Sequence, residues 1–311
     1  MIIRRTGKIA DGFYQLGHSD APVYLLDAER PALFDAGYAF MGRLYEKEIR
    51  DVLGLLPPAF LFLTHGHFDH IGAAGFLKRV WPGLQVAASA GVADVLGRPR
   101  TVETMRRYND ETGRVYLKQG LGLDPAWFTE DPFEPVAVDL PLTDGTRVGL
   151  GAGLNLEVLE TPGHTRDHLC FYVPERKILL AGEAAGIETE RGGFLTDFLV
   201  DYDAFCRGMV RLSGLEIAIL CEGHTGVFTG PDAAARLTAG QEACGRFAAL
   251  LEFIVREEGN DPDRAAARVA AERLDPGPFP HQPEEAYLQN VRAKVRAILK
   301  WRADIPPAPK A

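Results

Sequence analysis

The segment Thr64-His65-Gly66-His67-Phe68-Asp69-His70 constrains this chain more than any other stretch of its sequence. Three imidazoles and one carboxylate lie within six positions, directly after the apolar run 59–63. That run predicts a buried strand, so the polar side chains would lie on a loop at its carboxyl end, and residues 72–80 predict a helix after it. Neutral imidazoles and carboxylates are good ligands for zinc, iron and manganese. Because the chain has only eight histidines, the cluster predicts a metal site.

Residues of the same ligand types recur where other apolar runs end. The runs cover residues 31–34, 154–161, 177–182 and 217–221. The polar residues that follow them, in that order, are Asp35, then His164 and His168, then Glu183, then His224. Strands of one sheet that share an end would bring these side chains together. His18 and His281 fall outside the pattern and are expected to be ordinary histidines of the surface or loops.

These motifs together resemble the metallo-β-lactamase superfamily. The resemblance is carried by HxHxDH at 65–70, PGHT at 162–165, LLAG with an acid at 179–183, and the late Gly223-His224. It covers roughly residues 10 to 230. It implies an α/β fold, a four-layer αββα sandwich, with a C-terminal helical extension like that of the glyoxalase-II-like and thioesterase-like branch. A shared fold says much less about the substrate.

The resemblance implies a dinuclear metal site that binds two divalent ions, with zinc expected first and iron or manganese as alternatives. By the family pattern, the ligands of one ion would be His65, His67 and His164. The ligands of the second ion would be Asp69, His70 and His224. No further cofactor is expected.

Glu183 departs from the family pattern, which usually has an aspartate at the bridging position. We favour ligation, because the acid follows the LLAG run at the expected place. The alternatives are that Glu183 binds one ion or none, and that the site is mononuclear. Asp69 has a second expected role as the catalytic residue that accepts a proton from the attacking water and delivers it to the leaving group.

Asp35 and His168 lie where the family places residues that support the ligands. Asp35 would orient a ligand or fix its loop; alternatively it is a turn carboxylate bonded to backbone. For His168 a satisfied structural role is favoured over direct metal binding.

Three classes of function remain open. The first is a metallohydrolase that uses a metal-bound hydroxide on an ester, thioester or lactone of a small intracellular substrate, with thioester favoured; phosphodiester cleavage is possible with the same ions. The second is a redox enzyme with one iron, similar to sulfur dioxygenases of this fold. The third is a non-catalytic binding protein stabilised by metal. A metal count separates the first two classes, and a screen of esters and thioesters separates the first from the third.

Composition limits the partners. The net charge of −9 argues against nucleic acid, because phosphate backbones require a basic surface. The four cysteines lack CxxC pairing, which indicates reduced thiols. Residues 1–7 lack the apolar core of a signal peptide, and no run approaches membrane-spanning length. We therefore expect a cytoplasmic protein with a small-molecule substrate and no membrane partner; a homodimer is left open.

The chain divides by sequence texture into a catalytic domain over 1–230 and a helical extension over 231–311. Within the first, residues 1 to about 95 and 140 to 230 would form the two halves of the sandwich, and residues 97–135 an insertion over the site. Helices are expected from Asp232 to about 258, from Asp261 or Asp263 to about 274, and from 284 to about 301. The extension would form part of the substrate pocket or a dimer contact, or act only as a packing module.

Overall fold

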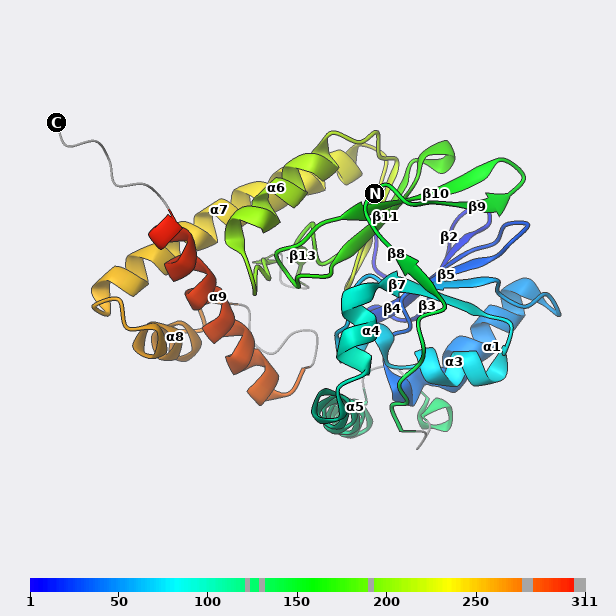
Figure 1. The fold of residues 1–311 in the computed structure, drawn as a ribbon, viewed down its shortest axis with the longest axis horizontal. Helices are drawn as coiled ribbons and strands as arrows, with labels where there is room; N and C mark the ends of the chain where they lie inside the picture. The colour runs from blue at the N-terminus through cyan, green and yellow to red at the C-terminus, as the bar shows by residue number, and fades with distance from the viewer. Residues whose placement is uncertain (121–123, 129–131, 190–192, 276–281, 305–311) are drawn as a thin grey trace.

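The computed structural model describes residues 1–120, 124–128, 132–189, 193–275 and 282–304. Two β-sheets lie face to face, helices cover their outer faces, and a group of helices extends from one end (Figure 1). This arrangement confirms the predicted αββα sandwich with a C-terminal helical region.

The first sheet follows the chain order of its strands. They are β2 (Gly7–Ala10), β3 (Phe13–His18), β4 (Ala21–Leu26), β5 (Ala32–Phe34), β6 (Phe60–Phe62), β7 (Gln85–Ser89) and β8 (Leu140–Leu142). The pairs from β5 to β8 are parallel, whereas those from β2 to β5 are antiparallel.

The second sheet mixes distant parts of the chain. In spatial order its strands are β1 (Ile2–Ile3), β16 (Val227–Thr229), β15 (Ile219–Glu222), β12 (Ile178–Gly182), β11 (Leu169–Val173), β10 (Leu154–Glu160) and β9 (Arg147–Gly151). The pair β12–β15 is parallel and the other pairs are antiparallel. A short hairpin, β13 (Ile187–Glu188) with β14 (Phe194–Leu195), stands apart from both sheets.

The helices lie between and after these strands. The α-helices of the described residues are α1 (Gly42–Leu53), α2 (Phe68–Ile71), α3 (Ala74–Val80), α4 (Ala90–Leu96), α5 (Pro99–Gln119), α6 (Tyr202–Ser213), α7 (Pro231–Glu257), α8 (Pro262–Ala271) and α9 (Glu284–Asp304). Single 3₁₀ turns are η1 (Ala39–Met41), η2 (Pro125–Trp127) and η3 (Pro174–Arg176).

The strands are apolar on both faces because one face packs against the other sheet and the other face packs against helices. Phe34 and Phe62 of the first sheet pack on Phe171 of the second, with ring centroids 5.4 to 5.9 Å apart. Burying an aromatic side chain of this size contributes about 1.5–3 kcal/mol. The outer face of the first sheet packs on α1, α3, α4 and α5, and that of the second on α6 and α7. Every strand residue of β4 and β12 is therefore buried.

Strand direction brings the predicted site residues together. The parallel strands β5 and β6 end at one edge, and so do β12 and β15. Because β10 is antiparallel to β11, which is antiparallel to β12, β10 ends at the same edge as β12. The loops that carry Asp35, His65, His164, Glu183 and His224 all leave these ends.

Two expectations about the halves and the helix caps are wrong. Leu140–Leu142 belongs to the first sheet, because β8 pairs with β7, while the N-terminal Ile2–Ile3 pairs with β16 of the second. Asp232 does not cap α7: the N-cap is Gly230, and Asp232 lies in the first turn, paired with the N-terminal amine. Asp261 does cap α8, through the N–H groups of Asp263 and Arg264.

The C-terminal helices have an apolar cluster of their own. Phe198, Leu251, Val269, Tyr287 and Ile298 join α7, α8, α9 and the segment before α6 in this cluster. Most of the expected break at 277–283, together with His281, lies outside the described residues, as does the proline-rich stretch 305–309.

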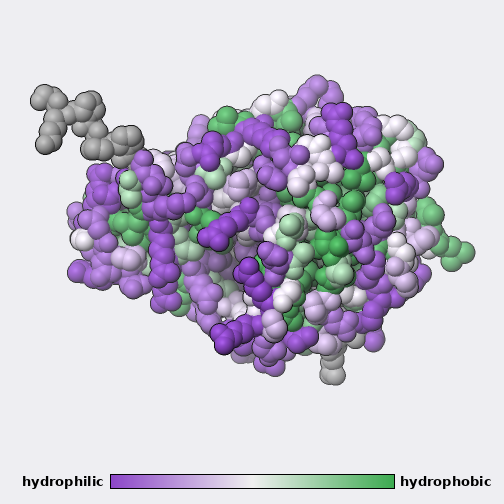
Figure 2. Space-filling model, in the orientation of Figure 1, coloured by the Kyte–Doolittle hydropathy of each residue, from purple (hydrophilic) through white to green (hydrophobic). Residues whose placement is uncertain are grey.

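Hydrophilic residues cover most of the face shown in Figure 2, with hydrophobic residues in smaller patches between them. Leu55, Val210 and Phe253 are large apolar side chains exposed at the surface, and they lie in the turn after α1, in α6 and in α7. Within the described residues, none of the helices combines the length and the apolar character needed to cross a bilayer.

Candidate metal centre

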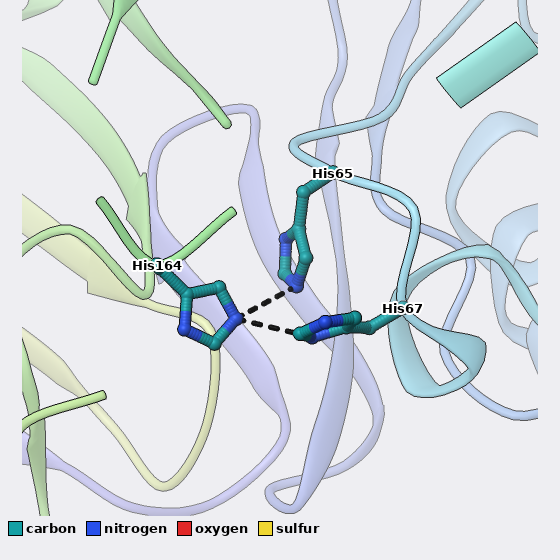
Figure 3. A group of neighbouring side chains, drawn as sticks. All are labelled: His65, His67 and His164. Atoms are coloured by element: carbon teal, nitrogen blue, oxygen red, sulfur yellow. Dashed lines mark hydrogen bonds between the residues drawn. The ribbon is translucent and has the colours of Figure 1, made fainter. Parts of the chain in front are cut away.

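Three histidines form the first half of the centre (Figure 3). His65 and His67 lie on the loop after β6, and His164 lies on the loop after β10. His164 Nε2 is 3.3 Å from His65 Nε2 and 3.1 Å from His67 Nδ1. Three ring nitrogens therefore face one point, as ligands of one cation would.

The second half is built around carboxylates. Asp69, His70 and His224 present ligand atoms that all lie within 4.8 Å of one another. His224 Nε2 is 3.6 Å from Asp69 Oδ2 and 2.9 Å from Glu183 Oε1, and His70 Nε2 is 3.3 Å from the same glutamate oxygen. Glu183 thus lies against the second group of ligands. Whether it also reaches the first group stays a prediction.

Asp35 holds His70 from behind. Asp35 Oδ2 accepts a hydrogen bond from His70 Nδ1 at 2.8 Å, which directs Nε2 of this ring toward Glu183. Asp35 also accepts the backbone N–H of Thr64 at 2.8 Å and the hydroxyl of Thr64. The Thr64 hydroxyl lies 3.0 Å from His65 Nδ1. Asp35 adopts the left-handed conformation (φ 57°), which turns the chain sharply after β5.

Backbone carbonyls orient the two late histidines. The carbonyl oxygen of Asp197 lies 2.8 Å from His164 Nδ1, and the carbonyl oxygen of Asp20 accepts from His224 Nδ1. A donated Nδ1–H leaves the lone pair on Nε2, which is the atom that faces the centre in both rings.

His168 supports the site without offering a ligand atom. Its Nδ1 lies 2.8 Å from the Thr161 hydroxyl, and its Nε2 accepts the backbone N–H of Glu183 at 3.1 Å. The close approach requires glycine at position 182, where a Cβ would lie 2.7 Å from His168 Nε2. Both ring nitrogens are used, so His168 fixes the start of the Glu183 loop.

The electrostatics of the first half favour neutral imidazoles. Burial, followed by the neighbouring histidines, lowers the pKa of His65 well below its usual value. Burial, followed by His164, lowers the pKa of His67 to about 3. Neutral imidazoles offer the lone pairs that metal binding requires.

The second half attracts positive charge. Burial would lower the pKa of His70, but Asp35, Glu183 and Asp69 raise it well above the usual value. Burial would also lower the pKa of His224, but Glu183 raises it above its usual value. Burial would raise the pKa of Glu183, yet His224 and His70 lower it well below its usual range. The negative charge of this half can be compensated either by a proton or by a metal cation.

The donor set fits divalent metal ions. Imidazoles and carboxylates are the ligand types of zinc, iron and manganese sites. Glu183 Oε2 is buried and has no hydrogen-bond partner among the described residues, so it retains capacity for a cation. Gly223 leaves room for this carboxylate, since a Cβ there would lie 2.7 Å from Glu183 Oε1.

A pocket of about 210 Å³ opens on both halves of the centre. His67, Asp69, His164 and Glu183 form its floor. Three other parts of the chain form its walls: α5, the β13–β14 hairpin and α9. The apolar side chains of these walls include Met105, Ile187, Leu195 and Ala286. Helix α5 lies within the predicted insertion, and α9 within the extension.

Sequence reasoning missed several residues that support the ligands. Thr64 lies beside the motif, and the apolar run before it gave no reason to single it out. Asp197 contributes a backbone carbonyl, which carries no residue-type signal. His18 belongs to neither group of candidate ligands; its Nδ1 accepts the N–H of Asp20 at 3.2 Å.

The model of the metallo-beta-lactamase superfamily matches residues 16–224, so the chain belongs to this superfamily. Membership, together with the relatives below, supports a hydrolytic enzyme, and the superfamily generally binds divalent metals.

Two curated relatives fit the predicted branch. Acyl-coenzyme A thioesterase MBLAC2 of Bos taurus is 28% identical over 237 residues, which cover 71% of this chain and 78% of that protein. Hydroxyacylglutathione hydrolase GloC of Haemophilus influenzae is 29% identical over 123 residues, or 40% of this chain and 48% of that protein. Among solved structures, a metallo-beta-lactamase family protein of Thermus thermophilus aligns with a TM-score of 0.64 at 23% identity, over 96% of this chain and 95% of the other. This similarity shows the fold alone.

Proposed function

We propose that this chain hydrolyses acyl thioesters with two divalent metal ions, zinc being the expected metal. The observation that carries the proposal is that both groups of candidate ligands line one pocket, the first through His67 and His164 and the second through Asp69. The names of the two curated relatives support the thioester, since both refer to acyl groups carried on thiol compounds.

His65, His67 and His164 would hold one ion, and Asp69, His70 and His224 the second, with Glu183 against the second group. Two bound ions supply a nucleophile by lowering the pKa of water, and they polarise the substrate carbonyl. Asp69 is the most exposed carboxylate of the centre, with a side chain 12% exposed against 3% for Glu183. It is therefore placed to hold the proton of the attacking water and pass it to the thiolate that leaves.

The pocket walls suit an acyl chain. Met105 from α5, Ile187 and Leu195 from the hairpin, and Ala286 from α9 present apolar surface beside the ligands. Each methylene that the walls bury would contribute about 0.8 kcal/mol, roughly a fourfold gain in kcat/KM per methylene. We propose that the insertion and the extension both serve as pocket walls in this way.

The test begins with elemental analysis of the protein in its native metal form. The same preparation is then assayed on acyl-coenzyme A thioesters of increasing chain length, matched oxygen esters, lactones and a phosphodiester. We expect two metal ions per chain and a preference for thioesters that rises with chain length until the pocket is filled. A single iron with no hydrolysis would favour the redox alternative, and hydrolysis of the phosphodiester alone would overturn the thioester assignment.

A further inference from the structure

A fully buried cation lies between the C-terminal extension and the metal centre. Lys294 of α9 is 1% exposed, and its ammonium group forms ion pairs with Asp275, at 2.6 Å, and with Asp197. Both carboxylates are themselves buried, at 2% and 6% exposure. The three charges join α9, the segment before α9, and the segment that leads into α6.

The cluster is stabilised by attraction between buried opposite charges. An isolated ammonium group in the interior is strongly unfavourable, so a buried lysine stays charged only beside acids. Burial acts to lower the pKa of Lys294, but Asp197 and Asp275 raise it above its usual value. Burial also raises the pKa of Asp275 to about 6. Lys294 therefore holds each carboxylate through a separate ion pair.

Asp197 connects this cluster to a ligand. Its carbonyl oxygen lies 2.8 Å from His164 Nδ1, and the residue also lines the pocket. The hydrogen bond fixes the tautomer and the plane of the His164 ring, whose Nε2 faces His65 and His67. The side chain of Asp197 is held by Lys294, so the lysine restrains the residue whose carbonyl orients the ring.

Among the described residues, other groups than Lys294, Asp197 and Asp275 hold the two histidines of the second half. His224 Nδ1 bonds to the carbonyl of Asp20, whose carboxylate accepts from Tyr116 of α5 at 2.6 Å. His70 is held by Asp35. Any effect transmitted from Lys294 through Asp197 should therefore reach the first half alone.

We propose that Lys294 is a positioning residue for the first metal: through Asp197 it fixes the His164 ring, so the C-terminal extension sets the metal affinity of the catalytic domain. The inference rests on His164 as a metal ligand, as the proposed function does, but it does not depend on which bond the enzyme cleaves.

The decisive comparison is Asp197→Asn against Asp275→Asn. Both remove one carboxylate charge from the same cluster, yet only Asp197 contacts His164. Each change is made in two backgrounds: His224→Ala, which leaves the first half intact, and His67→Ala, which leaves the second half. Co²⁺ alone is titrated into the metal-free proteins in competition with a chelator.

We expect Asp197→Asn to weaken Co²⁺ binding by about 10- to 100-fold in the His224→Ala background, because the loss of the ion pair with Lys294 frees the residue whose carbonyl orients the His164 ring. Asp275→Asn should leave the affinity there unchanged, and neither change should act in the His67→Ala background. Equal losses for the two variants, or an equal loss in both backgrounds, would overturn the proposal, because a purely structural cluster predicts that result.

Lys294→Met supplies the second test. It should weaken Co²⁺ binding as Asp197→Asn does. Lys300 lies on the same helix as Lys294 and forms an ion pair with Asp201, and Lys300→Met should leave Co²⁺ binding unchanged. Methionine at position 294 leaves two buried carboxylates without their cation, so this variant can fail to fold; the aspartate pair then decides. Folded Lys294→Met protein with unchanged affinity for Co²⁺ would contradict the proposal.

Discussion

The two halves of the candidate metal centre lie at one edge of the sandwich but differ in charge. The first half consists of three imidazoles, oriented by uncharged groups such as the Asp197 carbonyl and the Thr64 hydroxyl. The second half has Asp69 and Glu183 close to its imidazoles and Asp35 behind His70.

This difference indicates that the two halves would hold their ions in different ways. Carboxylates compensate the charge of a divalent ion directly, so the second half should hold its ion through electrostatic attraction. The first half offers no formal charge, so its affinity depends on how well three rings are oriented. Its cation would keep more positive charge for the substrate carbonyl.

His67→Ala should have the largest effect. Among the described residues, three imidazoles make up the first group of candidate ligands, and the loss of one leaves two. We expect the first ion to be lost and kcat/KM to fall by about a thousandfold or more, because the proposed mechanism would need both ions to lower the pKa of the attacking water and to polarise the carbonyl. Metal content and hydrolysis are measured on the same sample, with Lys300→Met as the control. Hydrolysis that survived complete loss of metal would refute the mechanism.

Glu183→Gln tests the second half with almost no change in shape. Removing the charge should weaken the second ion by about 100-fold and leave the first unchanged, since the carboxylate lies against His70 and His224. Activity should fall at limiting metal and recover in excess metal. The measurement is a two-step zinc titration. A variant with full metal content and full activity would show that Glu183 is not a ligand.

The sequence predicted the strands and the meeting of their polar ends because both follow local rules, whereas the division of the candidate ligands into two groups came from the family resemblance. Apolar runs became β5, β6, β10, β12 and β15, and strand direction placed their polar ends at one edge. The connections behind the ligands could not be predicted in this way. Lys294 and Asp197 are far apart in the chain, and the decisive atom of Asp197 is a carbonyl oxygen that every residue has. Sheet membership of β8 and β1 also depends on pairing between distant strands.

The stability of the metal-free protein should depend on pH in opposite ways for the two halves. The pKa of His65 and His67 is lowered by folding, so their contribution to stability increases with pH up to about 6.5, the value in the unfolded chain. The pKa of His70 and His224 is raised by folding, so their contribution is complete below about 6.5 and is lost as pH rises through the folded values.

Above pH 6.5 the metal-free protein should therefore lose up to about 1.4 kcal/mol per pH unit for each of these two groups. Denaturant unfolding of metal-free protein between about pH 6.5 and 9 measures this slope. Zinc should abolish the loss, because the cation replaces the proton in the second half. Asp35→Asn, which removes one cause of the raised pKa of His70, should make the slope shallower. A slope that is the same with and without Asp35 would contradict the assignment.

Thr64→Val should have the smallest effect, and it should act on both halves. The Thr64 hydroxyl donates to Asp35, 2.9 Å from Oδ2, and lies 3.0 Å from His65 Nδ1, so it joins His65 to the residue that holds His70. Valine has nearly the same shape but leaves the N–H of His65 without its partner, at a cost of about 1–3 kcal/mol in the free energy of unfolding.

Metal affinity should fall by only a few-fold, in both halves, because Asp35 still accepts the backbone N–H of residue 64 and still holds His70. Thr64→Ser keeps the hydroxyl and is the matched control. Zinc titrations in the His67→Ala and His224→Ala backgrounds read the halves separately. If valine weakened zinc binding in the first half alone, the two halves would be independent of each other. The geometry of the first half would then depend on Thr64 without any contribution from Asp35.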